Sequence, residues 1–138
     1  MSVNARGEKP IGEALASIFK PALSPLGFEL ASVADDGVQF EGAMVRFEAR
    51  YVPLDGELAV YVIPRETGER LQLHMYLRAI KSSAASKLGD AVAESAEVAL
   101  RIAETYAAAL PEATTVLNGE ASELDRARTA RLWGAPPV

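Results

Sequence analysis

Cysteine is absent from the 138 residues of this sequence, which contain a single histidine and a single tryptophan. Without cysteine there are no disulfide bonds, thiolate metal sites or cysteine nucleophiles, and the chain suits a reducing compartment. The start, MSVNARGEKP, lacks the apolar core of a secretory signal, and no segment approaches the ~20 apolar residues that cross a bilayer. We therefore expect a cytoplasmic protein that has no membrane as a partner.

Motifs for nucleotide, metal and nucleophile chemistry are missing as well. Neither G-x-G-x-x-G nor G-x-x-x-x-G-K-[ST] occurs, and no serine lies in a nucleophile-elbow pattern. Asp35-Asp36 lacks the spacing of an EF-hand calcium loop, and Asp36-Gly37 is typical of a hairpin turn. Because the formal net charge is −5, phosphate backbones are repelled on average and a basic protein is attracted more readily. We expect no metal, no cofactor and no nucleic acid as ligands.

The first strong pattern is a helix from Pro10 to Leu23. Pro10 suits the first turn of a helix, while the prolines that follow and Gly27 predict an end near Leu23. One face of this helix is apolar. Its members are Ile11, Leu15, Ile18, Phe19, Ala22 and Leu23.

Short runs of Val, Phe, Tyr and Leu follow from Phe28 to Leu77, separated by turn residues. This spacing predicts an antiparallel meander of four or five strands. The first strand is irregular, because Phe28 and Leu30 would point away from Val33. The expected turns are Asp36-Gly37, Glu41-Gly42, Pro53 to Gly56 and Pro64 to Gly68.

Three hairpin registers place one apolar set on one face of the sheet, as a real sheet requires. A tight turn at Gly42-Ala43 predicts the pairs Phe40–Val45 and Val38–Phe47. The loop 53–56 predicts Tyr51–Leu58, Ala49–Val60 and Phe47–Val62, and the loop 65–68 predicts Val62–Leu71, Val60–Leu73 and Leu58–Met75.

The last third of the chain is helical in pattern. Residues 78–88 form a connector or a short helix, and Asp90 is the expected N-cap of a long helix ended by Pro111. Its apolar stripe is Val92, Ala96, Ala99, Ala103, Tyr106 and Leu110. Ser122 and Asp125 have capping-box spacing and start a short helix toward Trp133, which Gly134 ends.

The order helix, meander, helix, helix predicts an α+β fold with the helices packed on the apolar face of the sheet. We expect one domain over 1–138, with flexible residues 1–8 and a tail at 134–138. The segment 122–133 carries Arg126, Arg128 and Arg131, and it either packs back through Leu124, Leu132 and Trp133 or docks onto another subunit.

The opposite face of the expected sheet carries the candidate site. Its rows are Arg46, Ile63, Arg70; Glu48, Tyr61, Gln72; and Arg50, Ala59, His74, with Tyr76 near Glu57. Such a face is either simply solvated, with ion pairs supporting the sheet, or a partner surface anchored by tyrosine and arginine. The unperturbed pKa of a histidine, ~6.5, suits acid–base catalysis, so His74 could act as a general acid or base. A lone strand histidine is more typical of a surface position, so no catalytic residue is assigned.

The expected build is loosely similar to bacterial proteins that act by binding, among them toxin-neutralising immunity proteins and secretion chaperones. The similarity is one of class, with no residue carried over. The sequence thus favours a non-catalytic protein-binding module with a protein partner or a second copy of itself. Its expected contact residues are Arg46, Glu48, Arg50, Tyr61, Gln72, His74 and Tyr76. The alternative is a small-molecule-binding protein or enzyme with a pocket between sheet and helices.

Overall fold

The computed structural model describes residues 10–89 and 92–132. Several sequence-based expectations lie outside these residues and are not addressed by the structure. They are the flexible segment 1–8, the N-cap at Asp90, the position of Trp133, and the tail 134–138.

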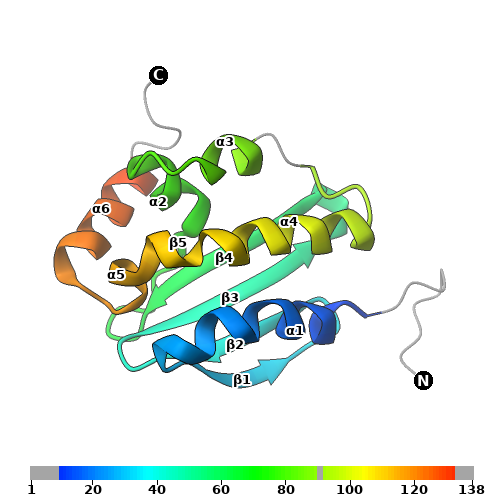
Figure 1. The fold of residues 1–138 in the computed structure, drawn as a ribbon, viewed down its shortest axis with the longest axis horizontal. Helices are drawn as coiled ribbons and strands as arrows, with labels where there is room; N and C mark the ends of the chain where they lie inside the picture. Colours follow the sequence, from blue (N-terminus) through cyan, green and yellow to red (C-terminus); the bar gives the residue numbers. More distant parts are fainter. Residues whose placement is uncertain (1–9, 90–91, 133–138) are drawn as a thin grey trace.

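A five-stranded antiparallel sheet forms the centre of the fold, with neighbouring strands in sequence order (Figure 1). The predicted meander is therefore confirmed, with five strands. Its members are β1 (Glu29–Val33), β2 (Gly37–Glu41), β3 (Val45–Val52), β4 (Glu57–Pro64) and β5 (Leu71–Gln72). A bulge between Leu30 and Ser32 shifts the register of β1, which accounts for the irregular pattern of the first strand.

Two helices cover the apolar face of the sheet, α1 (Gly12–Leu23) and α4 (Ala96–Ala109) (Figure 1). The ring of Phe19 on α1 lies 4.9 Å from the ring of Phe47 on β3, measured between centroids. Ala99 and Ala103 of α4 are fully buried, and such small side chains allow close packing. Helix α4 begins later than predicted, because the side chain of Ser95 caps it by accepting a hydrogen bond from the Val98 N–H.

The β3–β4 register agrees with the prediction at every predicted pair, including Tyr51–Leu58 and Phe47–Val62. The β2–β3 register was predicted wrongly by two residues, since Val38 pairs with Ala49 and Phe40 pairs with Phe47. The turn lies one residue later than predicted, at Ala43-Met44, because the Gly42 N–H donates to the Val45 carbonyl at 2.9 Å. An even shift leaves each side chain on its predicted face.

The largest correction concerns residues 73–79, which form the helix α2 (Leu73–Ala79) rather than a strand. The predicted pairs Val60–Leu73 and Leu58–Met75 are therefore wrong, and β5 is only two residues long. The buried residues Leu73, Tyr76 and Leu77 have i, i+3, i+4 spacing, so the same segment also satisfies the helical period. Its Leu, Met, Arg and Ala residues favour the helix.

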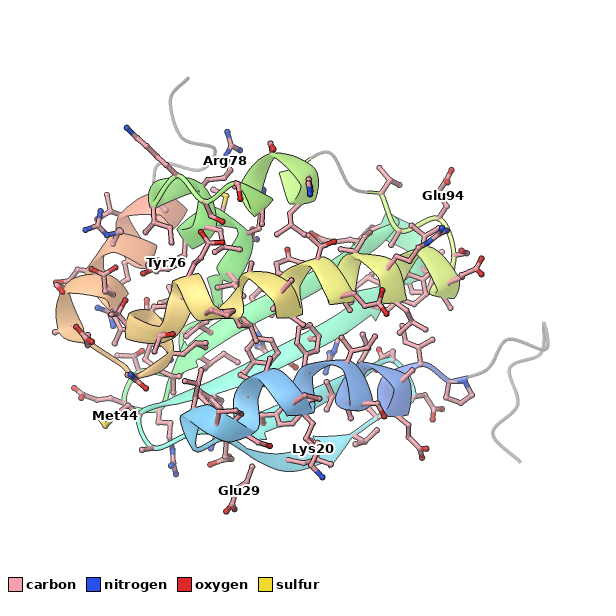
Figure 2. The ribbon with its side chains drawn as sticks, viewed as in Figure 1. Lys20, Glu29, Met44, Tyr76, Arg78 and Glu94 are labelled. Atoms are coloured by element: carbon pink, nitrogen blue, oxygen red, sulfur yellow. The ribbon has the colours of Figure 1, made fainter. Side chains whose placement is uncertain are left out.

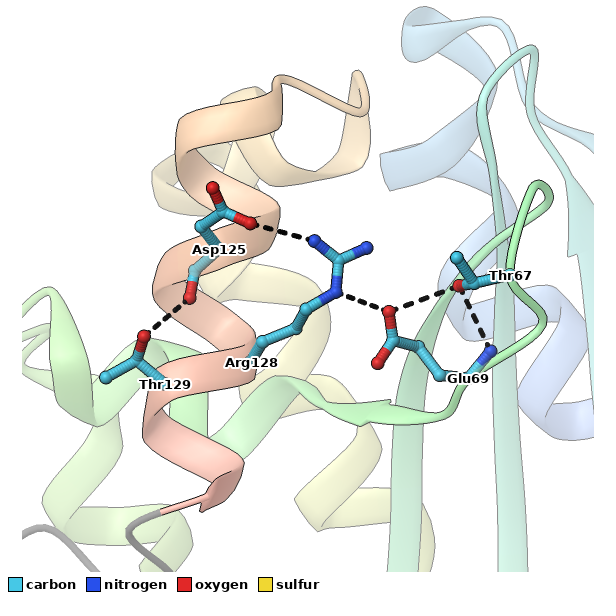
Figure 3. A network of polar contacts seen from close by, with 5 residues as sticks. All are labelled: Thr67, Glu69, Asp125, Arg128 and Thr129. Carbon is cyan, nitrogen blue, oxygen red and sulfur yellow. Dashed lines mark hydrogen bonds and ion pairs between the residues drawn. The ribbon is translucent and has the colours of Figure 1, made fainter.

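Three further helices complete the described fold: α3 (Ala84–Gly89), which precedes α4, and α5 (Thr114–Leu117) and α6 (Ala121–Leu132), which follow it. Short 3₁₀ turns lie at Ser24–Leu26, Pro53–Asp55 and Leu110–Ala113. Helix α6 contacts α2 and β5, and its Ala127 is buried. Arg128 of α6 pairs with Glu69 of the loop after β4 and, at 2.9 Å, with Asp125 (Figure 3). The described part of the arginine-bearing segment therefore packs back on its own chain.

Candidate functional site

Five of the seven candidate contact residues lie on the predicted outer face of the sheet. Arg46, Glu48 and Arg50 alternate along β3, and the row Glu48, Tyr61, Gln72 is confirmed by direct pairing in the sheet. This face is opposite the one on which Phe47 meets α1. Arg46, Arg50 and Gln72 are exposed, and Tyr61 is half-buried.

A buried carboxylate lies at the centre of this face. The side chain of Glu48 is only 2 % exposed and accepts hydrogen bonds from Arg50 Nη2 at 3.2 Å, Arg70 Nε at 3.0 Å and Gln39 Nε2 at 3.3 Å. The Arg70 guanidinium also lies 5.8 Å from the centroid of the Tyr61 ring, within cation–π range. We call Gln39, Glu48, Arg50, Tyr61 and Arg70 the Glu48 cluster.

Hydrogen bonding and charge from Glu48 raise the pKa of Arg70 above its ordinary value. A buried carboxylate is costly unless it is paired and hydrogen-bonded, and here three donors meet that requirement. The cluster therefore holds two otherwise flexible arginine side chains in place on an exposed sheet. The sequence predicted that Arg70 lies on this face, but neither Arg70 nor Gln39 was among the predicted contact residues.

Charges of both signs lie on the outer face. A second carboxylate, Glu41, pairs with Arg46 at 3.0 Å and with Arg65 at 3.4 Å. The four arginine side chains of these pairs and of the Glu48 cluster are 46–55 % exposed, whereas Glu48 is buried. Exposed carboxylates share this face, because Glu29 lies opposite Glu41 in the sheet and Glu57 alternates with Ala59 and Tyr61 on β4. The charge available to a partner on this face is therefore mixed.

Tyr76 is not on this face, contrary to the prediction. It lies on α2 between the sheet edge and α6, and its side chain is 2 % exposed (Figure 2). Its hydroxyl donates to Glu123 Oε1 at 2.6 Å and lies 3.4 Å from Thr115 Oγ1. Burial, together with the hydrogen bond to Glu123, raises the pKa of Tyr76 to about 12. Tyr76 joins helices and does not form a contact surface.

His74 also leaves the outer face, because it lies on α2 at the edge of a pocket of about 210 Å³. We call this cavity the β4 pocket. It lies on the side of β4 away from β3, since β5, α2, α3 and α4 supply its other walls. The lining residues are Glu57, Leu58, Ala59, Val60, Gln72, His74, Leu88, Ile102 and Tyr106.

The polar side chains of the β4 pocket are unpaired within the described residues. The side chains of Glu57, Gln72, His74 and Tyr106 make no hydrogen bond or ion pair with any other described residue, and Nε2 of His74 is also shielded from solvent. Burial and the charge of Arg78 lower the pKa of His74. Burial and the nearby Glu57 raise the pKa of Tyr106. At neutral pH the imidazole is therefore uncharged and the phenol keeps its proton.

A pocket between sheet and helices was the alternative predicted from the sequence, but no residue was assigned to that pocket. The three helix residues, Leu88, Ile102 and Tyr106, depend on how α3 and α4 pack, which local pattern does not encode. The helical spacing of Leu73, Tyr76 and Leu77 was the available signal that β5 stops short and leaves this space.

In the part of the chain that the structure describes, no three His, Asp or Glu side chains gather to hold a metal ion. No helix of residues 10–89 and 92–132 has the length and apolar character needed to cross a membrane. Comparisons with protein families, with curated proteins and with solved structures found no significant match to this chain.

Proposed function

We propose that this chain is a non-catalytic protein-binding module, immunity-protein-like or chaperone-like, that uses the outer face of its sheet. One observation carries the proposal: on an exposed sheet, two arginines and a tyrosine are ordered around the buried carboxylate of Glu48. The absence of cysteine supports a cytoplasmic location for this activity.

Ordering before binding favours affinity, because a flexible arginine otherwise loses conformational entropy when a partner immobilises it. Tyrosine and arginine are also the side chains that most often anchor protein interfaces. The exposed arginines of this face favour contact with Asp and Glu side chains of a partner. The basic partner suggested by the net charge of the chain is also compatible with this face, because Glu29, Glu41 and Glu57 lie on it.

The test is capture of a partner from the native host, followed by titration of the purified pair by calorimetry. We expect Arg50→Glu combined with Tyr61→Ala to weaken binding at least tenfold while the circular dichroism spectrum is kept. The matched control is Arg101→Glu, an exposed charge reversal on α4, which should leave the affinity unchanged. Equal affinity of all three proteins would remove this face from consideration.

A second copy of the chain is the other partner expected from the sequence. Sedimentation over a range of protein concentrations distinguishes self-association from binding of a different protein. If the mass doubles with concentration and the double variant abolishes this, the partner is another copy of the chain.

The β4 pocket supports a second candidate function, that of a small-molecule-binding protein. The specific observation is the group of polar side chains that line it without partners among the described residues. Thermal shifts against a metabolite panel test it, because a ligand that binds only the folded state raises the apparent stability. A panel that leaves the midpoint unchanged would count against this function.

A further inference from the structure

The edge of β4 beside the pocket lacks a neighbouring strand. Strand β5 pairs only with Tyr61 and Val62 of β4, through Gln72 and Leu71. At the other end, the Ala93 N–H donates to the Gly56 carbonyl at 2.7 Å. Between these two contacts lie residues 57–60, the four consecutive β4 residues that line the pocket.

Backbone groups of this stretch are available for recognition. In an antiparallel strand, alternate residues direct both their N–H and their C=O to the same side. Two of the four residues 57–60 therefore direct a donor and an acceptor away from β3. No described side chain or backbone group outside the strand pairing bonds to them. Buried backbone groups are normally satisfied, so this edge favours a ligand that replaces the missing strand.

The walls restrict the size and shape of such a ligand. A volume of about 210 Å³ is below the roughly 300–1,000 Å³ of pockets that hold drug-sized molecules. Leu88, Ile102 and the ring of Tyr106 supply apolar surface from α3 and α4. A compact ring fits these limits better than an extended chain, which would need room for several residues.

The polar side chains favour an uncharged ligand. A neutral imidazole and a protonated phenol offer hydrogen bonds without charge, and Gln72 offers an amide that both donates and accepts. Glu57 is the acidic residue of the lining, and it is exposed to water, which screens its interaction with a ligand. The pocket thus presents donors and acceptors side by side.

We propose that the β4 pocket binds a compact, uncharged ring that carries an N–H donor next to a carbonyl or ring-nitrogen acceptor, as lactams and nucleobases do. The adjacent donor and acceptor pair with the N–H and C=O of one β4 edge residue, and the ring lies against Leu88 and Ile102. This inference rests on the second candidate function and is independent of the outer face.

The test uses two probes that differ by one methyl group, δ-valerolactam and N-methyl-δ-valerolactam, added to the ¹⁵N-labelled protein. We expect δ-valerolactam to shift the amide signals of residues 57–60, 72 and 74 with saturable binding. The N-methyl compound lacks the donor and should bind at least tenfold more weakly. Equal binding of the two, or shifts confined to other residues, would overturn the inference.

Variants on α4 provide a second readout. Ile102→Phe fills the pocket, and Val98→Phe places the same side chain one turn earlier, at a partly exposed position outside the lining. We expect the first variant to lose lactam binding and the second to keep it. Binding that survives Ile102→Phe in the folded protein places the ligand elsewhere and contradicts the inference.

A third probe distinguishes a free ring from the backbone of a partner, which offers the same amide chemistry. Acetyl-trialanine-amide should bind more weakly than δ-valerolactam. Tighter binding of the peptide would overturn the inference of a ring ligand and indicate that a partner adds a strand to β4. If δ-valerolactam fails while members of a metabolite panel shift residues of the pocket, the ligand class is wrong and the small-molecule function stands. If no compound shifts these residues, both fail.

Discussion

The hydroxyl of Tyr76 lies 2.6 Å from Oε1 of Glu123, which is 47 residues further along the chain. This hydrogen bond connects α2 to α6, and Arg126 adds an ion pair to the same carboxylate at 3.3 Å. The hydrogen bond from Tyr76 is the main reason that the pKa of Glu123 is below its ordinary value. The segment 73–79, which was predicted to be a strand, is thus a helix that is joined to α6 by a distant acidic residue.

We expect Tyr76→Phe to lower the free energy of unfolding at neutral pH and to raise the pKa of Glu123. Because the folded-state pKa of Glu123 is depressed, its contribution is present above the unfolded-state pKa of ~4.3 and is lost as the pH falls through the folded value. The stability difference between wild type and Tyr76→Phe should therefore shrink in acid. Urea unfolding at pH 7 and pH 3, with NMR titration of the Glu123 carboxyl, measures both effects. A difference that does not change with pH would contradict this assignment.

The buried carboxylate of the Glu48 cluster gives the second prediction. Glu48→Gln keeps the shape of the side chain but removes the charge that Arg50 and Arg70 contact, and we expect a loss of about 1–3 kcal/mol in the free energy of unfolding. The control is Glu41→Gln, whose more exposed ion pairs should contribute less than about 1 kcal/mol. Urea denaturation of both variants measures this order, and equal losses would show that Glu48 is no more important than a surface carboxylate.

The end of α2 supplies a third prediction. Lys81 has φ +60°, and it ends the helix in a Schellman arrangement: the Lys81 N–H donates to the Arg78 carbonyl and the Ser82 N–H to the Leu77 carbonyl. A lysine is strained in this left-handed conformation, whereas glycine is not. We expect Lys81→Gly to raise the free energy of unfolding by about 0.5–1 kcal/mol in urea titrations. Lys87→Gly, inside α3, should instead destabilise; a stabilising effect there would point to charge and not to backbone conformation.

The sequence predicted correctly those parts of the fold in which the hydrophobic pattern is compatible with a single strand register. Between β3 and β4, regular alternation and the turn Pro53 to Gly56 leave a single register that buries Phe47 and Val62 together. The outer-face pair of Glu48 and Tyr61 follows from that register, and Gln72 joins the row through the pairing of β4 with β5. The hydrogen bonds that make Glu48 the centre of the face depend on side-chain conformations, which no periodicity specifies.

Residues 73–79 show why the rest of the site could not be derived. Their apolar residues fit a period of two as well as the helical spacing of Leu73, Tyr76 and Leu77, and only tertiary packing chooses between them. Packing against α6 favours the helix, and Glu123, which contacts Tyr76, is distant in the sequence. Once β5 stops after Gln72, His74 belongs to the β4 pocket and not to the outer face.

His74 offers the last prediction, because its Nε2 is shielded from solvent and has no hydrogen-bond partner among the described residues. An unsatisfied polar atom destabilises the fold, so we expect His74→Leu to raise the free energy of unfolding at pH 7 by about 1 kcal/mol. Because burial and Arg78 lower the folded-state pKa of His74, its unfolded form binds protons first, and the stability of the wild type falls as the pH drops below ~6.5. His74→Leu should remove that part of the loss.

Urea titrations between pH 7 and pH 5 compare the two proteins, with Gln72→Leu as the control for a polar pocket residue that does not titrate. A variant that is more stable but no longer binds δ-valerolactam would indicate that the fold retains this histidine for binding at a cost in stability. A variant that loses stability at pH 7 would show instead that the imidazole packs favourably where it is. The role of the imidazole would then be structural, and the polar contribution to the β4 pocket would be reduced to Glu57, Gln72 and Tyr106.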